Sequence, residues 1–272
     1  MSFTQEIKKI TAAFSGTIGF HAVRLTDGYS LTHNADDVFP AASVIKLHLL
    51  IAALQQVQSG QLELQQRHAL PHAEIVAGSG LLQHLEVGAE LTLHDYLTLM
   101  IIVSDNTATN MMIDLLGGRE VINAQIAAWD MAWNGTITRV VGKLMLPPER
   151  KNPDQLAGKL AQIVPLEVAQ VLEALYKQQL LNPEFTAIAL GILKQQQYTE
   201  MIGRLLPDGL VTATKSGQII GVRNDVGLVF SSQPYAVALC SQGCSDLRYH
   251  IDNEAIWALA KISKLIFDQM QP

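Results

Sequence analysis

The chain has 272 residues, a formal net charge of -6 and 49% hydrophobic residues, with only 16% charged residues. This length can bury a large core, and the hydrophobic content excludes a disordered chain. Because the net charge is negative, no basic surface is expected for a phosphate backbone, so we expect no nucleic-acid partner. The longest apolar run, Leu49 to Leu54, is far shorter than the about 18 residues that a membrane span needs, so we expect no membrane partner.

The N-terminus, as written, lacks an uninterrupted apolar stretch that leads to a small-residue cleavage site. We therefore expect a cytoplasmic protein, unless an export signal has been removed from the chain.

The hydrophobic pattern near the N-terminus predicts a helix over residues 5–14 and a strand over 17–25. An Asp27-Gly28 turn follows, and a second short strand is expected from Tyr29. From residue 43 to residue 181 the pattern is helical, and we expect no strand there. The expected helices span 44–57, 92–103, 106–116 and 165–181, and their ends carry capping signals such as Thr92 with Asp95.

The last third of the chain begins with a predicted helix over 183–194. Three apolar, β-branched runs then predict strands over 210–214, 222–230 and 235–240, and a final helix is expected over 253–270. Strands thus lie near both ends of the chain. The simplest assembly is an α/β fold of the α+β type, with a five-stranded, mainly antiparallel sheet flanked by the terminal helices.

In this arrangement the helical middle of the chain forms an inserted, all-helical domain. We expect residues 1–36 and 196–272 to form the sheet domain and residues 37–195 to form the helical domain. The active site is expected at their junction, because clefts between domains are the usual place for a ligand. Residues 140–160 contain several prolines and glycines without periodicity, which predicts a long surface loop.

The only cysteines are Cys240 and Cys244, and their spacing matches no zinc motif. We expect two thiols, with Cys240 in a buried strand and Cys244 in the loop after it; a redox pair is the alternative. The eight histidines form no metal-binding spacing. We therefore expect no metal and no cofactor.

Three short motifs carry most of the functional information: Ser43-Val-Ile-Lys46, Ser104-Asp105-Asn106 and Lys215-Ser216-Gly217. At ordinary residue frequencies, this ordered set is expected on the order of once per thousand unrelated chains. Each motif alone fits an ordinary helix cap or turn, but their order and their helix, loop and strand contexts together favour a catalytic site.

The first two motifs supply a nucleophile and its base. Ser43 lies where a helix begins, and Lys46 follows it by three residues on the same helix face. A serine hydroxyl needs a base, and a lysine can act as one if burial and neighbouring positive charge lower its pKa. Ser104 is positioned to relay a proton to a leaving nitrogen, Asn106 to bind a substrate amide, and Asp105 is expected to be structural.

The third motif is expected to end an apolar strand, so that Lys215 projects its charge into the cleft and Ser216 binds substrate beside it. The backbone N–H groups of Gln218 and Ser43 are candidates for an oxyanion hole. On the following strand, Arg223 is a candidate for binding a substrate carboxylate.

With these motifs, the chain resembles the class A β-lactamase-like serine hydrolases, a group of penicillin-recognising enzymes. The similar segments are Phe39-Pro40-Ala41-Ala42-Ser43 with Lys46, residues 99–110, residues 205–207, and Gly221-Val222-Arg223-Asn224-Asp225. The resemblance covers most of the chain and implies a β-lactamase/transpeptidase-like fold. It also implies a Ser43 acyl-enzyme and a small-molecule substrate, either a β-lactam or a related amide or ester.

The chain departs from the family in the loop that supplies the deacylation base. Aligning Thr138-Arg139 with the start of that loop places Leu144 at the position of the family's glutamate and Pro148 at that of its asparagine. Glu149 and Asn152 have the right residue types at a shifted position. We therefore expect slow deacylation, unless Glu149 replaces the missing base.

Two alternatives remain open from the sequence. One is a cytosolic peptidase or esterase that uses the same serine and lysine on an unknown acyl substrate. The other is a non-catalytic ligand-binding protein on the same fold.

Overall fold

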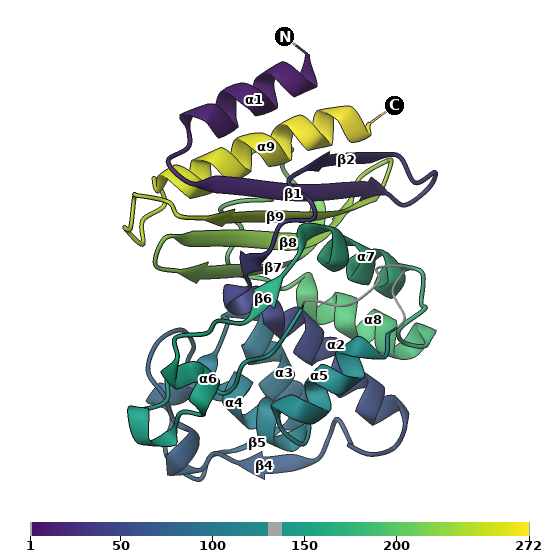
Figure 1. The fold of residues 1–272 in the computed structure, drawn as a ribbon. Helices are drawn as coiled ribbons and strands as arrows, with labels where there is room; N and C mark the ends of the chain where they lie inside the picture. Colours follow the sequence, from purple (N-terminus) through teal and green to yellow (C-terminus); the bar gives the residue numbers. More distant parts are fainter. Residues whose placement is uncertain (1, 130–137, 272) are drawn as a thin grey trace.

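The protein is described by a computed structural model, which covers residues 2–129 and 138–271. Its main sheet has five strands in the order β2-β1-β9-β8-β7, and every neighbouring pair is antiparallel (Figure 1). The predicted α/β class with a five-stranded sheet is therefore confirmed. The strands are β1 (Thr17–Arg24), β2 (Ser30–His33), β7 (Val211–Ile219), β8 (Val222–Phe230) and β9 (Tyr235–Gln242).

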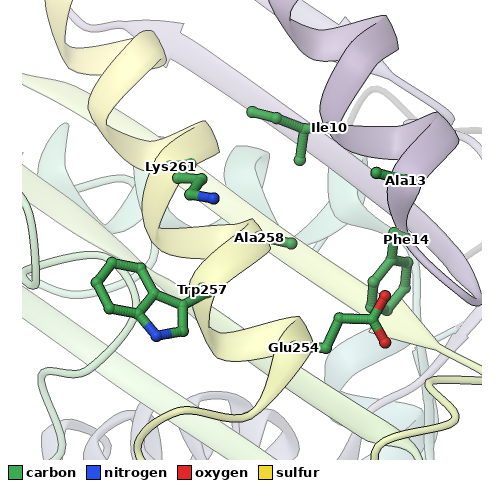
Figure 2. A pocket seen from close by; sticks show the side chains of 7 residues that line it. All are labelled: Ile10, Ala13, Phe14, Glu254, Trp257, Ala258 and Lys261. Carbon is green, nitrogen blue, oxygen red and sulfur yellow. The ribbon is translucent and has the colours of Figure 1, made fainter.

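Helices cover both faces of this sheet. The terminal helices α1 (Phe3–Ala13) and α9 (Glu254–Met270) lie side by side on one face, and α7 (Pro165–Tyr176) packs on the other (Figure 1). Between α1 and α9 lies a pocket, which is remote from the helical region below the sheet (Figure 2). Its lining residues are Ile10, Ala13, Phe14, Glu254, Trp257, Ala258 and Lys261.

The helical region is built around one central helix, α2 (Ile45–Gln58). Every residue from Ile45 to Leu54 is buried, because other helices surround this part of α2. The surrounding helices are α3 (Leu93–Ile102), α4 (Asn106–Leu115), α5 (Arg119–Ala127) and α8 (Pro183–Leu193). The shorter helices are η1 (Ala42–Val44), η2 (His72–Glu74), η3 (Leu82–His84), η4 (Pro148–Arg150) and α6 (Pro153–Leu156).

The expectation of no strand between residues 43 and 181 is wrong. Two small ladders occur: β3 (Phe39–Pro40) pairs with β6 (Gln162–Ile163), and β4 (Arg67–Ala69) pairs with β5 (Glu90–Thr92). Strands of two or three residues are too short for an alternating pattern to be visible in the sequence. The helix α5 was also not predicted.

The predicted ends of one strand and one helix, and the predicted loop over residues 140–160, need correction. Strand β7 continues to Ile219 and so includes Lys215 and Ser216 in its interior, where we expected it to end. Helix α7 ends at Tyr176 instead of residue 181, and Gln178 just beyond it has a φ of 59°, which a helix cannot continue. Residues 140–160 are not only a surface loop, because they contain η4 and α6 and their first residues border a cavity.

Both cysteines are buried and unbonded, Cys240 in β9 and Cys244 shortly after that strand. No helix within residues 2–129 and 138–271 is long and apolar enough to cross a membrane.

Two glycines offer a matched test of this packing. A Cβ at Gly227, in β8, would lie 2.4 Å from the carbonyl oxygen of Ala213 on β7, whereas a Cβ at Gly191, in α8, meets nothing within 4 Å. We expect Gly227→Ala to lower the free energy of unfolding by about 1–3 kcal/mol through overpacking. Gly191→Ala should instead raise it by about 0.5–1 kcal/mol, because alanine favours the helix. Urea unfolding of both variants measures the difference; equal effects would contradict the packing.

Candidate active site

The nucleophile candidate Ser43 lies in the middle of η1, directly before α2, and is half-buried. The residue before it, Ala42, has a φ of 46°, which is unusual for a residue with a side chain. Strand β7 lies against this turn so closely that a Cβ on Gly217 would be 3.0 Å from the Ser43 nitrogen and 2.9 Å from that of Val44. Only glycine lets the strand approach the nucleophile in this way.

A second contact ties the sheet to the turn before Ser43. The Asn224 side chain, on β8, donates to the carbonyl oxygens of Pro40 (2.8 Å) and Ala41 (3.3 Å), and its oxygen accepts from the Ser241 N–H (3.1 Å). The turn before Ser43 is therefore held by hydrogen bonds from the sheet. The sequence alone does not indicate that Asn224 makes these contacts.

Lys46 is completely buried one helical turn after Ser43. Its Nζ donates to the carbonyl oxygen of Ser104 at 2.6 Å, to the Ser104 Oγ at 3.1 Å and to the Asn106 Oδ1 at 3.1 Å. Burial holds the pKa of Lys46 well below its usual value, and the positive charge of Lys215 lowers that pKa further, while Asp105 opposes the change. A lysine whose pKa is lowered in this way can accept a proton from a serine.

The Ser104 turn is held by its neighbour Asp105. One carboxylate oxygen of Asp105 accepts from the backbone N–H groups of Leu81 (2.6 Å) and Leu82 (2.8 Å), and the other accepts from that of Ala108 (2.9 Å). Ser104 itself has a φ of 55°. The Asp105 carboxylate thus binds backbone N–H groups and holds the turn. On either side of it, the side chains of Ser104 and Asn106 accept hydrogen bonds from Lys46.

Lys215 and Ser216 lie in the buried part of β7 and are not among the residues that border the cleft. The Lys215 Nζ donates to the Ser216 carbonyl oxygen at 2.7 Å. Burial lowers the pKa of Lys215 to about 7, although the nearby Asp225 carboxyl opposes the change. Burial also raises the pKa of Asp225, whose Oδ2 accepts from the Ile202 N–H at 2.9 Å.

The sequence predicts that Arg223 binds a substrate carboxylate in the cleft, but Arg223 is not among the residues that border the cleft. Its guanidinium is fully buried and donates to the carbonyl oxygens of Ile219, Val222 and Arg248 at 2.7 to 2.8 Å. The Tyr249 ring lies over it, 4.7 Å from the guanidinium carbon, and is 64% exposed. Tyr249 therefore borders the cleft where Arg223 was expected.

The cleft itself has a volume of about 690 Å³ and brings together residues from distant parts of the chain. Ser43, Asn106 and Gln218 all border it. Since β7 is the edge strand of the sheet, the backbone groups along its free side are available to a bound molecule. In the described part of the chain, no group of three or more His, Cys, Asp or Glu side chains could hold a metal ion.

Comparison with known proteins shows the family of this chain. The model of the β-lactamase enzyme family matches residues 2–270. The chain belongs to the β-lactamase enzyme family. It is therefore a β-lactamase-like serine hydrolase, as the three motifs indicated.

Individual relatives of this β-lactamase family member are distant, and the three named here cover 84% to 98% of it. A β-lactamase from Sphaerobacter thermophilus has a TM-score of 0.86 and 31% identity, covering 98% of this chain and 96% of its own. PBP-A, in a leucine-to-glutamate variant solved as an acyl-enzyme complex with penicillin G, has a TM-score of 0.84 and 27% identity, covering 98% and 95%. The β-lactamase CARB-4 of Pseudomonas aeruginosa is 24% identical over 84% of this chain and 76% of its own length.

In this family member, two hydrogen bonds with the Asn110 side chain hold the backbone of Leu144. This role of Asn110 was not predicted from the sequence. The Asn110 side chain accepts from the Leu144 N–H at 2.7 Å and donates to its carbonyl oxygen at 3.1 Å. The Leu144 residue borders the cleft. Glu149 lies on η4, is exposed, and is not among the residues that border the cleft. Asn152 caps α6 by accepting from the Gln155 N–H.

The charge of Lys215 gives a test of Lys46 as the base. Replacing Lys215 by methionine removes a positive charge that lowers the pKa of Lys46, so that pKa is expected to rise. Neutral Lys46 then forms only at higher pH, and the acid limb of the acylation rate moves up by about one pH unit. Because the pKa of Lys215 is about 7, the difference between this variant and the parent protein is expected at pH values below about 7, where Lys215 carries its charge.

Lys215→Arg, which keeps the charge, is the matched control and should leave the position of the limb unchanged. An identical limb in Lys215→Met and the parent protein would show that Lys215 does not influence the base.

Proposed function

We propose that this protein forms an acyl-enzyme on Ser43 with β-lactams or related amides and esters, and releases the acyl group slowly. The observation that carries the proposal is the buried Lys46 amine, with its lowered pKa, between the nucleophile's helix and the Ser104 turn. Lys46 takes the Ser43 proton as Oγ attacks the acyl carbon. Ser104, which is hydrogen-bonded to Lys46, passes the proton to the leaving group.

The backbone N–H groups of Ser43 and Gln218 are suited to stabilise the oxyanion of the tetrahedral intermediate. Both residues border the cleft, and the close approach of β7 at Gly217 brings their backbones together. Two donors aimed at a developing negative charge are worth several kcal/mol in reactions of this type, on the order of 3 kcal/mol each. Asn106, which borders the same cleft, is the candidate for binding the amide of the acyl donor.

Slow release follows from the side chains around the cleft. No residue that borders it within the described ranges is an aspartate or glutamate. The resemblance to the class A enzymes puts Leu144, which borders the cleft, at the position of the family's glutamate. The exposed Glu149 is not placed to replace it. Without a carboxylate to activate water, acylation proceeds but hydrolysis of the ester on Ser43 is slow.

The direct test is incubation with penicillin G followed by intact-mass measurement. We expect one adduct per chain, which persists for many times the half-time of its formation and is absent in Ser43→Ala. Failure of several β-lactams and acyl phosphonates to modify Ser43 would overturn the proposal and favour a binding protein.

A carboxylate placed at residue 144 should restore the missing step. Because Asn110 holds the backbone of Leu144, a side chain at this position is directed by the same contacts. We expect Leu144→Glu to accelerate loss of the penicilloyl adduct by about 100-fold. Leu144→Gln is similar in size and hydrogen bonding but cannot act as a base, so it should leave deacylation slow. Equal deacylation rates in both variants would mean that the missing carboxylate does not limit turnover.

A further inference from the structure

The charged side chains that border the cleft carry one sign of charge. Among the residues that the structure describes, they are Lys143, Lys151 and Lys159, and no acidic side chain borders the cleft with them. The chain as a whole has a formal net charge of -6, so the cleft differs in charge from the rest of the protein. A cleft lined by positive charge attracts anionic ligands and raises their local concentration.

The three lysines belong to one stretch of chain, residues 143–161, which we call the lysine segment. The end of the lysine segment returns to the nucleophile. The carbonyl oxygen of Ala161 accepts from the N–H of Ala41 at 2.7 Å, and Ala41 lies two residues before Ser43. Lys159 is two residues before Ala161, so the two Cα atoms are at most about 7 Å apart. The lysine segment therefore brings positive charge close to the reacting serine.

Lys143 has a structural part in the lysine segment. Its amine pairs with Glu74 at 2.8 Å and with Asp114, and its side chain is only 18% exposed. Glu74 also pairs with Arg150 of the same segment at 3.0 Å. Because Glu74 binds the lysine segment at two points, the segment is held in place before a ligand arrives, and binding requires little further ordering of it.

The amines of Lys151 and Lys159 are available to an anion. In the described part of the chain the Lys151 amine makes no hydrogen bond and no ion pair, although the residue is half-buried. The Lys159 amine pairs with Asp154 at 2.8 Å, but both side chains are well exposed, and such a pair contributes little to stability. Asp154 also pairs with Arg119 at 3.0 Å, so Asp154 keeps a partner when Lys159 turns to a ligand.

We propose that Lys151 and Lys159 form a carboxylate subsite, and that the preferred acyl donors carry a carboxylate at the far end of the acyl chain. Such donors are half-esters or half-amides of dicarboxylic acids. Two ammonium groups on one wall of the cleft bind a carboxylate by charge-assisted hydrogen bonds, which are stronger than neutral ones. This inference rests on the proposed function, because the acyl chain must be attached to Ser43.

The subsite lies on the acyl side of the reacting carbonyl. In the proposed reaction the leaving group receives its proton from Ser104, which belongs to the turn between α3 and α4 and is hydrogen-bonded to Lys46. The lysines belong to a different segment, which ends beside the turn before Ser43. The acyl part of the donor is therefore the part that extends along the lysine segment.

The acylation step conserves atoms and charge. The Ser43 Oγ forms a bond to the carbonyl carbon of the donor, and the bond from that carbon to the leaving oxygen or nitrogen breaks. The Ser43 proton passes through Lys46 and Ser104 to the leaving group, which departs as a neutral alcohol or amine. The product is an ester of Ser43 whose distal carboxylate pairs with Lys151 and Lys159.

The test compares three p-nitrophenyl esters with the same leaving group and the same acyl backbone: the adipate half-ester, its methyl ester and the 6-trimethylammoniohexanoate. The p-nitrophenol burst and the intact mass give the second-order rate constant for acylation of Ser43. We expect the anionic adipate to react at least about fivefold faster than its neutral methyl ester, and the cationic ester to react slowest. Raising the salt concentration from about 0.02 M to about 0.5 M should reduce these differences, because salt screens exposed charges.

Charge-changing variants make the result specific to the two lysines. The readout is the ratio of the adipate constant to the methyl ester constant, so a general loss of activity cancels. We expect Lys151→Glu to bring this ratio to one or below, and Lys151→Gln to lower it partway. Lys159→Glu should lower the ratio as well. The matched control is Lys9→Glu, which changes the net charge equally at an exposed position of α1, outside the cleft, and should leave the ratio unchanged.

Equal constants for the three esters would overturn the carboxylate subsite. The same fall of the ratio in Lys9→Glu as in Lys151→Glu would also overturn it, because the effect would then come from the net charge of the protein. Acylation by penicillin G without acylation by any of the esters would overturn the subsite and leave the proposed function standing. If neither penicillin G nor the esters modify Ser43, the proposed function itself fails.

Discussion

The burial of the Lys46 amine is the constraint on which the rest of the site depends. Burying a charged lysine is unfavourable, so a buried lysine needs hydrogen-bond partners or has a lowered pKa. Lys46 has both. Three hydrogen bonds to Ser104 and Asn106 connect α2 to the turn between α3 and α4, so the helix that follows Ser43 and the Ser104 turn are held together. The same burial lowers the pKa of Lys46, so one packing arrangement gives the proposed base both its position and its lowered pKa.

The sheet completes the site through a close backbone approach. Strand β7 touches the Ser43 turn where Gly217 lacks a side chain, and Asn224 on β8 binds the carbonyl oxygens that precede Ser43. These contacts explain why a motif with glycine at its end lies in the middle of a strand. The strand's buried lysine then influences Lys46 through its charge and does not need to reach the cleft.

The fold class and the family could be predicted from the sequence, since the apolar runs and the three motifs are local features. The end of β7 could not be predicted, because Lys215 and Ser216 are polar residues that only the packing of the fold buries. The orientation of the Arg223 side chain could not be predicted either. Its guanidinium binds the carbonyl oxygens of residues 219, 222 and 248, which only the fold brings together.

We have proposed that Ser43 is acylated faster than its acyl group is released. The pre-steady-state reaction with a chromogenic β-lactam at several enzyme concentrations tests this directly. We expect a burst whose amplitude equals the enzyme concentration, followed by a much slower steady rate, with both absent in Ser43→Ala. Rapid linear turnover without a burst would contradict slow release, because it would require a deacylation base, and no described residue that borders the cleft is an aspartate or glutamate.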